Sequence, residues 1–299
     1  MTARFPLAFG AMQCGGRADQ AQSFAMLEAC HAAGIRHFDT AWAYTDGASE
    51  RIIGQFARQH EIEVATKIGF EGGAGRANLT SQFDTSRKRL DCAVDLLYLH
   101  RFDPETALEE SLECLARWQA DGLFTRIGLS NFAAWHVMKA QTIAARLGTR
   151  IDAIQPMYSL IKRQAEVEIL PMAQDQGIVA YTYSPLGGGL LTGKYASGGT
   201  GRLTEDARYA ARYGAPHLPD IATGLAALAA ELGTHPATLA VAWAKCHPTA
   251  PVPLISARDP GQLAPSLAAA DYPMTTELYA RIAALSPAPP PATDRTEEA

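Results

Sequence analysis

The sequence lacks the cysteine pattern of a secreted or zinc-binding protein. Its five cysteines are odd in number, and no two of them form a C-x-x-C pair. This pattern argues against a disulfide framework and a metal-binding zinc knuckle, and it indicates reduced thiols in a reducing compartment. Residues 1–16 also lack the basic start, apolar run and small-residue cleavage site of a signal peptide. We therefore expect a cytoplasmic protein.

Long apolar runs and an excess of positive charge are also missing. No stretch of the 299 residues is apolar enough to span a bilayer, so we expect no membrane association. The net charge of −5 gives no support to nucleic-acid binding. Hydrophobic residues make up 47% of the chain and charged residues 19%, which allows a large buried core. Length alone allows either two domains or one α/β barrel.

The sequence does contain a regular alternation of strand-like and helix-like segments. Strand-like runs occur at residues 7–10, 35–39, 64–68, 94–100, 126–130, 153–157, 178–183 and 252–255. About eight strand-helix units predict a single (β/α)₈ TIM barrel over residues 1–286. The segment 187–219 breaks this rhythm, because it is long, rich in glycine and arginine and without a clear strand, as functional loops are. Residues 287–299 are proline-rich and charged, so we expect a disordered tail.

Polar residues that end three successive strand-like runs are candidates for catalysis. They are Asp39, Lys67 and His100, and Tyr44 lies in the loop that follows Asp39. The three strand ends are separated by about one strand-plus-helix unit each. In a barrel, all four residues would reach the carboxyl-terminal end of the strands, where active sites of this fold lie. Each residue alone also has a structural explanation, such as core packing for Tyr44, but their shared location is stronger evidence.

Longer motifs carry a resemblance to a known family. They are Asp39-Thr40-Ala41 with Tyr44, Ser49-Glu50-Arg51 with Gly54, Ala65-Thr66-Lys67, and the segments 95–100, 128–132 and 183–195. From Phe9 to about Ala270 the chain resembles the aldo-keto reductase superfamily. The segments 44–50 and 189–195 look most like the branch that contains aflatoxin-aldehyde and succinic-semialdehyde reductases. The resemblance implies an oxidoreductase that reduces aldehydes and ketones to alcohols by hydride transfer.

The resemblance also implies a role for each candidate catalytic residue. Tyr44 is expected to be the general acid, Lys67 and Asp39 to tune it, and His100 to orient the carbonyl group. The reaction requires such groups, because negative charge develops on the carbonyl oxygen. An unperturbed tyrosine, with a pKa of about 10, is a poor acid at neutral pH. A nearby ammonium lowers a tyrosine pKa, and a carboxylate keeps that ammonium charged.

A nicotinamide cofactor is implied as well, although no G-x-G-x-x-G fingerprint opens a βαβ unit in this sequence. Ser130, Asn131 and Gln155 match positions that hydrogen-bond the carboxamide, and Tyr183 matches the ring that stacks on the nicotinamide. The positions matching the loop around the pyrophosphate are Ser184, Pro185, Leu186, Gly187, Gly189 and Lys194. Glycines there allow the backbone to approach phosphate closely, although a flexible surface loop would also be glycine-rich.

The segment expected to bind adenosine departs from the usual family pattern. Arg258 and Gln262 match the segment that receives the 2′-phosphate, and Arg258 supplies a suitable cation. However, Ser256 stands where glycine or lysine is common, and Pro265 stands where an acid usually contacts adenine. Asp259 adds a negative charge beside the expected phosphate. We expect NADPH as the cofactor, with NADH or dual use left open.

The substrate is the least specified feature. We expect a small-molecule carbonyl compound, and the candidates to line an apolar pocket are Met12, Trp42, Phe102 and Phe132. Arg208 and Arg212, in the long loop, are candidates to meet an anionic substrate or the cofactor phosphates, or they belong to a solvated helix face. Two alternatives remain open: a sugar or polyol dehydrogenase, and a nicotinamide-binding regulatory subunit like the potassium-channel β subunits. The sequence does not indicate an oligomeric state.

Overall fold

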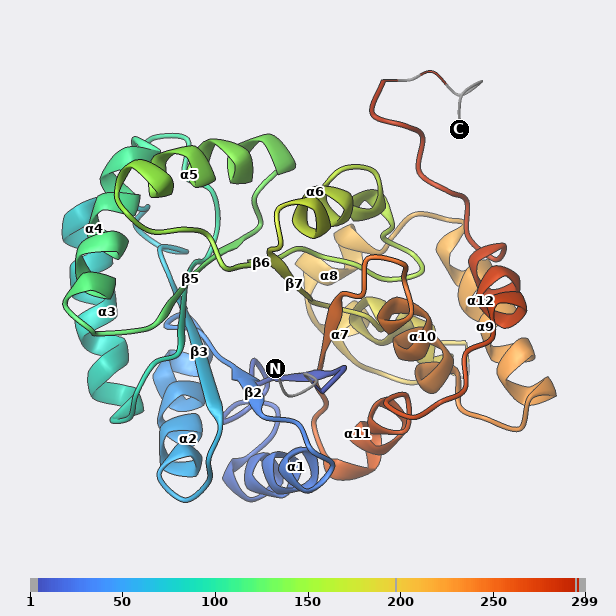
Figure 1. Ribbon diagram of the computed structural model, residues 1–299. Coiled ribbons are helices and arrows are strands. Elements are labelled where there is room, and N and C mark those ends of the chain that lie inside the picture. Colours follow the sequence, from blue (N-terminus) through green and yellow to red (C-terminus); the bar gives the residue numbers. More distant parts are fainter. Residues whose placement is uncertain (1–4, 197, 294, 296–299) are drawn as a thin grey trace.

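The computed structural model describes residues 5–196, 198–293 and 295, and it contains a closed barrel of eight parallel strands (Figure 1). The strands are β1 (Ala8–Gly10), β2 (His37–Asp39), β3 (Glu63–Ile68), β4 (Leu96–Leu99), β5 (Arg126–Ser130), β6 (Ala153–Gln155), β7 (Val179–Thr182) and β8 (Val252–Ile255). Each strand pairs with the next along the chain, and β8 pairs with β1. The predicted (β/α)₈ barrel is confirmed.

Helices surround this barrel (Figure 1). They are α1 (Gln20–Ala32), α2 (Ala48–Ala57), α3 (Arg76–Leu90), α4 (Leu108–Ala120), α5 (Ala134–Arg146), α6 (Ile169–Asp175), α9 (Leu218–Glu231), α10 (Pro236–Lys245), α11 (Pro260–Leu267) and α12 (Thr276–Ala283). Local sequence explains several starts: Asp19 caps α1 by accepting from the Gln22 amide, and proline occupies the first turn of α9, α10 and α11.

The long segment after β7 contains no strand within its described residues. It forms the 3₁₀ helix η3 (Gly187–Thr192) and the short helices α7 (Arg202–Glu205) and α8 (Ala207–Arg212). Two other 3₁₀ turns, η1 (Thr45–Gly47) and η2 (Gln164–Glu166), lie in the loops after β2 and β6. No single described helix has the length and hydropathy needed to cross a bilayer, and α9 and α10 meet that test only jointly, across a bend of 102°.

The side chains of the strands alternate between two cores, one between the barrel and the helices and one inside the barrel. Phe38 of β2 faces the surrounding helices, whereas its neighbours His37 and Asp39 face the barrel interior, as expected when successive side chains point to opposite faces. In the barrel interior, alanines pack with the rings of Tyr98 and Tyr181. A Cβ atom on Gly128 would lie 2.3 Å from the Tyr98 ring, so the ring can occupy this position only because residue 128 has no side chain. The aromatic rings therefore fill the interior of the barrel.

The carboxyl-terminal region ends differently from the other units. After β8, α11 is followed by α12. Arg163 donates to the carbonyl oxygen of Ala283 (3.2 Å), the last residue of α12, and to that of Ser286 (3.0 Å), just beyond the helix. Residues 287–293 and 295 form no helix or strand. The expected disordered tail also includes residues 294 and 296–299, which lie outside the described residues, so the disorder stays a prediction.

Close packing between α2 and α3 yields a first prediction. A Cβ atom on Gly54 would lie 1.8 Å from the carbonyl oxygen of Leu90, so the helices would have to separate in the Gly54→Ala variant. We expect this variant to lose about 1 to 3 kcal/mol of unfolding free energy, measured by urea denaturation. Gly75→Ala is the control, because a Cβ atom there meets nothing closer than 3.7 Å. Equal losses in both variants would contradict the packing argument.

Candidate active site

A cavity of about 1060 Å³ opens at the carboxyl-terminal ends of the strands. Its walls come from the loops after β1, β2, β3, β4, β5, β7 and β8, from the end of β6, and from the long segment after β7. Asp39, Tyr44 and His100 line it, whereas Lys67 is fully buried and does not. The structure therefore brings three of the four candidate catalytic residues to one cavity and places the fourth behind its wall.

A buried ion pair joins β2 to β3. The Lys67 ammonium donates to the Asp39 carboxylate and to the carbonyl oxygen of Thr40 (2.7 Å). The second carboxylate oxygen of Asp39 accepts a hydrogen bond from the Gln155 amide (2.8 Å). The Lys67 Nζ atom also lies 5.0 Å from the centre of the Tyr44 ring. The ammonium is thus held by oxygen atoms on one side and faces the phenol on the other.

The charges of this pair shape the acidity of Tyr44. Burial raises the pKa of Tyr44 above its ordinary value, and the Lys67 charge acts in the opposite direction without cancelling the rise. Burial alone would lower the pKa of Lys67, but Asp39 and Tyr44 raise it above the ordinary value. We expected Lys67 to lower the Tyr44 pKa, and its effect has that sign, but burial outweighs it. Tyr44 therefore keeps its proton at neutral pH while facing a cation.

His100 follows β4 and faces Tyr44. The two ring centres are 5.8 Å apart, with the rings nearly perpendicular, and Phe70 packs against the imidazole at 4.8 Å. Burial lowers the pKa of His100 well below its ordinary value, and the charges of Lys67 and Arg101 add to this effect. A neutral imidazole at neutral pH donates one hydrogen bond and carries no charge. The phenol and this imidazole can therefore both donate to one oxygen atom in the cavity.

The four residues expected at the nicotinamide end lie together at the ends of β5, β6 and β7. Asn131 donates to the His100 carbonyl oxygen (2.9 Å) and to the Ser130 hydroxyl (3.0 Å) and accepts from the Tyr183 hydroxyl (2.7 Å). Ser130 donates to the Gln155 carbonyl oxygen (3.1 Å). All four expected residues line the cavity. They form one hydrogen-bonded group whose polar side chains lie beside His100.

The loop after β7 has a left-handed backbone that brings its amides close to the cavity. Ser184, Gly187, Gly188 and Gly189 have φ angles of 61°, 56°, 67° and 93°. The expected positions that line the cavity are Ser184, Pro185, Leu186, Gly189, Lys194, Arg258 and Gln262. Gly187 does not line it, because it packs beneath the loop, where a Cβ atom would lie 2.3 Å from Ile161. Gly188 is exposed to the cavity in its place.

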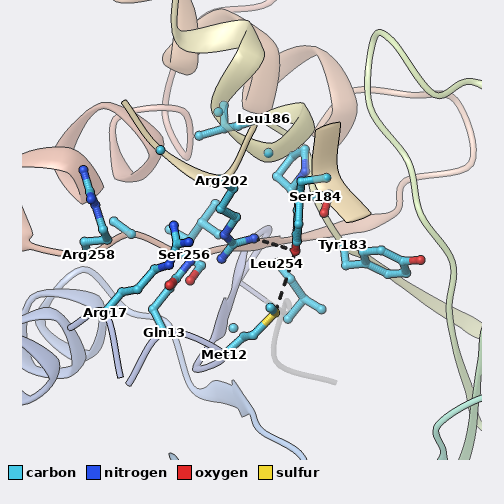
Figure 2. Close-up of a pocket in the computed structure, with 18 of the residues that line it drawn as sticks. Met12, Gln13, Arg17, Tyr183, Ser184, Leu186, Arg202, Leu254, Ser256 and Arg258 are labelled. Atoms are coloured by element: carbon cyan, nitrogen blue, oxygen red, sulfur yellow. Dashed lines mark hydrogen bonds between the residues drawn. The ribbon is translucent and has the colours of Figure 1, made fainter. Parts of the chain in front are cut away.

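Several cations surround this part of the cavity (Figure 2). Arg17, Lys194, Arg202 and Arg258 all line it. Burial lowers the pKa of Lys194, and the charges of Arg258, Arg202 and Arg17 lower it further, while Glu205 opposes them. Anionic groups bound here would relieve this mutual repulsion. The donor set therefore suits a ligand with several phosphates, and the described residues contain no His, Cys, Asp and Glu group suited to a metal ion.

The sequence pattern did not indicate two of these cations, Arg17 and Arg202, or the nearby side-chain amide of Gln13. Gln13 and Arg17 lie in the loop after β1, and Figure 2 shows them facing Arg202 from α7. Arg17 pairs with Glu205 of α7 (3.0 Å). The same strand-end rule that identified Asp39 pointed to the loop after β1, but there only Met12 was selected. For Arg202, the only indication in the sequence was the arginine content of the segment 187–219.

Of the candidate substrate residues, Met12 lines the cavity, as do Arg208 and Arg212. Tyr209 donates to the Met12 sulfur (3.9 Å) and accepts from Arg202 (2.9 Å); dashed lines in Figure 2 mark both bonds. Arg208 pairs with Asp206 (2.9 Å), and the Arg212 guanidinium lies 5.2 Å from the centre of the Tyr209 ring.

The structure does not bring Trp42, Phe102 or Phe132 to the cavity. The Trp42 indole lies 5.5 Å from the Arg89 guanidinium, and Phe102 stacks on His136 with 3.7 Å between ring centres. Phe132 is 6% exposed and packs edge-on against Phe102. Each follows a strand end as expected, but its side chain turns toward the surrounding helices.

Comparisons with known proteins agree with this geometry. The model of the Aldo/keto reductase family matches residues 6–287. The chain is 39% identical over 195 residues to Aflatoxin B1 aldehyde reductase member 2 of Mus musculus, covering 62% of this chain and 53% of that protein. It is also 39% identical over 202 residues to Aflatoxin B1 aldehyde reductase member 4 of Homo sapiens, covering 64% of this chain and 61% of that protein.

A longer match is to a protein of another kind. The chain is 32% identical over 321 aligned positions to a probable voltage-gated potassium channel subunit beta of Oryza sativa subsp. japonica, covering 96% of this chain and 94% of that protein. By contrast, the matched region spans a little more than half the length of the two aldehyde reductases.

The lowered pKa of His100 predicts a pH dependence of stability. The unfolded chain binds a proton at this histidine near pH 6.5, whereas the folded protein resists it, so unfolding free energy falls as pH decreases below 6.5. We expect the wild type to lose up to about 1.4 kcal/mol per pH unit more than His100→Gln between pH 7 and 5. Urea denaturation at both pH values measures the difference. Parallel losses would contradict the penalty on charging His100.

Proposed function

The chain belongs to the aldo/keto reductase family, and we propose that it reduces aldehydes and ketones to alcohols by hydride transfer from NADPH. The main support is the buried Asp39–Lys67 pair behind Tyr44, at a cavity that His100 also lines. The names of the aldehyde reductases that it resembles support the substrate class.

Tyr44 and His100 act on the oxygen of the substrate carbonyl. The bound cofactor would supply the hydride. Burial keeps the proton on Tyr44 until negative charge develops on that oxygen, which then takes the proton. The neutral His100 donates a hydrogen bond to the same oxygen and thereby orients the carbonyl.

Lys67 and Asp39 make this proton transfer possible in a buried site. When Tyr44 gives up its proton, the remaining phenolate faces the Lys67 ammonium, which stabilises it. Asp39 and the Thr40 carbonyl oxygen hold the ammonium in place, and Gln155 orients the carboxylate. In alcohol oxidation, Tyr44 would be the base.

The remaining expected residues fit a nicotinamide dinucleotide. Ser130, Asn131, Gln155 and Tyr183 would hold the nicotinamide end, next to His100. The left-handed loop at 184–189, with Lys194 and the newly found Arg17 and Arg202, would hold the pyrophosphate. Met12, Phe70 and Tyr209 would line the substrate end of the cavity.

Arg258 and Gln262 would receive the 2′-phosphate, so NADPH is the proposed cofactor. Asp259 also lines this part of the cavity and caps α11 by accepting from the Gln262 amide (2.9 Å). Its negative charge weakens the preference for a phosphate and is the reason to test NADH alongside.

A second candidate function rests on the match to the probable channel β subunit, which covers nearly the whole chain. In that case the chain would bind NADPH and regulate a partner, with slow turnover of every carbonyl compound. An oxidative sugar or polyol dehydrogenase would instead show activity with NAD(P)⁺ at alkaline pH. Turnover measurements in both directions separate the three functions.

Replacing the proposed acid tests the reaction directly. We expect Tyr44→Phe to reduce kcat for 4-nitrobenzaldehyde and succinic semialdehyde by roughly 100- to 10,000-fold, because it removes the proton donor while leaving the ring. NADPH binding, followed by protein fluorescence, should persist. Tyr158→Phe, which removes a buried hydroxyl bonded to Glu166 away from the cavity, is the control. Unchanged turnover in Tyr44→Phe would exclude Tyr44 as the acid.

Charge changes beside the expected 2′-phosphate test the cofactor preference. We expect Arg258→Ala to weaken NADPH binding by roughly tenfold or more, with a smaller effect on NADH, because a charge-assisted bond to phosphate is lost. Asp259→Asn should act in the opposite direction, since it removes a negative charge while an asparagine still caps α11. Dissociation constants for both cofactors measure the effects, and equal changes for the two cofactors would contradict this assignment.

A further inference from the structure

A second buried ion pair lies next to the loop that carries Tyr44. Glu50, in the first turn of α2, has a fully buried side chain, and Arg89, in the last turn of α3, has a side chain that is 20% exposed. The Arg89 Nη1 atom lies 3.2 Å from a Glu50 carboxylate oxygen. Neither residue lines the cavity, so neither contacts a ligand there.

Arg89 holds the Tyr44 loop at two points. Its Nη1 atom donates to the carbonyl oxygen of Trp42 (2.9 Å), and its guanidinium lies 5.5 Å from the centre of the Trp42 ring. At the other end of the loop, a Cβ atom on Gly47 would lie only 2.3 Å from the Arg89 Nε atom. Arg89 therefore packs against the residues on both sides of Tyr44.

Glu50 connects this contact to the strand that carries Lys67. Thr66, the residue before Lys67, donates to Glu50 (2.7 Å). Because neighbouring side chains of a strand point to opposite faces, Thr66 reaches outward to Glu50 while Lys67 reaches into the barrel. The Trp42 amide also donates to the Lys67 carbonyl oxygen (3.0 Å). The loop that carries Tyr44 and the strand that carries Lys67 are therefore connected through the Glu50–Arg89 ion pair.

The turn after Tyr44 has a backbone that needs such support. Thr45 and Asp46 have φ angles of 47° and 50°, and Gly47 follows at 82°. Left-handed conformations of non-glycine residues persist only where the surroundings impose them. On the side facing β1, the Thr45 hydroxyl donates to the Cys14 carbonyl oxygen (2.9 Å). On the side facing α3, the contacts come from Arg89.

We propose that Glu50 and Arg89 are positioning residues that fix Tyr44 against Lys67 and the reacting carbonyl group. This role rests on the proposed reduction with Tyr44 as the acid. Loss of the pair relaxes the turn, and a shift of about 1 Å in a reacting group costs on the order of 100-fold in rate. The pair acts on kcat through the loop, without contact to cofactor or substrate.

The kinetic test compares two buried ion pairs. We expect Arg89→Ala to lower kcat by about 100-fold with little change in the NADPH dissociation constant, and Arg89→Lys to recover part of the loss. Arg163→Ala is the matched control: it breaks the Arg163–Glu166 pair, whose side chains are 13% and 14% exposed and lie away from the cavity. A wild-type kcat in Arg89→Ala, or an equal loss in Arg163→Ala, would overturn the proposal.

Amide hydrogen exchange supplies a readout that does not need turnover. We expect residues 40–50 to exchange faster in Arg89→Ala and unchanged in Arg163→Ala. If Arg89→Ala fails to fold, the isosteric Glu50→Gln is judged by the same two measurements. Tyr44→Phe is assayed in the same series: unchanged turnover there contradicts the proposed acid alone, and the exchange data still decide whether Arg89 holds the loop. Unchanged exchange in residues 40–50 of the folded variants would refute the positioning role.

Discussion

The site depends on the cost of burying a charge. An ammonium without contact to water is tolerated only if its protons meet acceptors and its charge meets a partner. Lys67 meets these conditions with Asp39 and the Thr40 carbonyl oxygen, and Gln155 in turn satisfies Asp39. Because these contacts come from β2, β3 and β6, three strands must close around the pair before it is stable. The same charge acts on the phenol of Tyr44, and it adds to the effect of burial in lowering the pKa of His100.

Much of this arrangement followed from the sequence, because it depends on properties that repeat along the chain. Strand-helix alternation predicted the barrel, and parallel strands bring their polar end residues to one rim. Asp39, Lys67 and His100 were identifiable for that reason. Proximity to a strand end does not specify side-chain direction, however, so Trp42 and Phe102 were expected in a cavity that they do not reach. The turn into the following helix decides that direction.

Contacts between segments that are distant in the sequence were the other features that the sequence did not predict. Arg17 and Arg202 are 185 positions apart and come together only because α7 lies over the loop after β1. The burial of Glu50 could not be predicted for a different reason. A glutamate in the first turn of a helix usually interacts with the positive end of the helix dipole and faces solvent. Here it is buried and bonded to Thr66 and Arg89. Only the packing of α2 and α3 against β3 reveals that the motif residue is part of an internal network.

The burial of Lys67 has a chemical consequence beyond electrostatics. Aldehydes condense with unprotonated, accessible amines to form imines, which would consume an amine beside the cavity. Lys67 is fully buried, and its raised pKa keeps it protonated, so its nitrogen has no lone pair to offer and no path to an electrophile. The arrangement that places the Lys67 charge beside Tyr44 therefore also prevents Lys67 from acting as a nucleophile. A reactive carbonyl compound that enters the cavity experiences the positive charge of Lys67 but cannot react with its nitrogen atom.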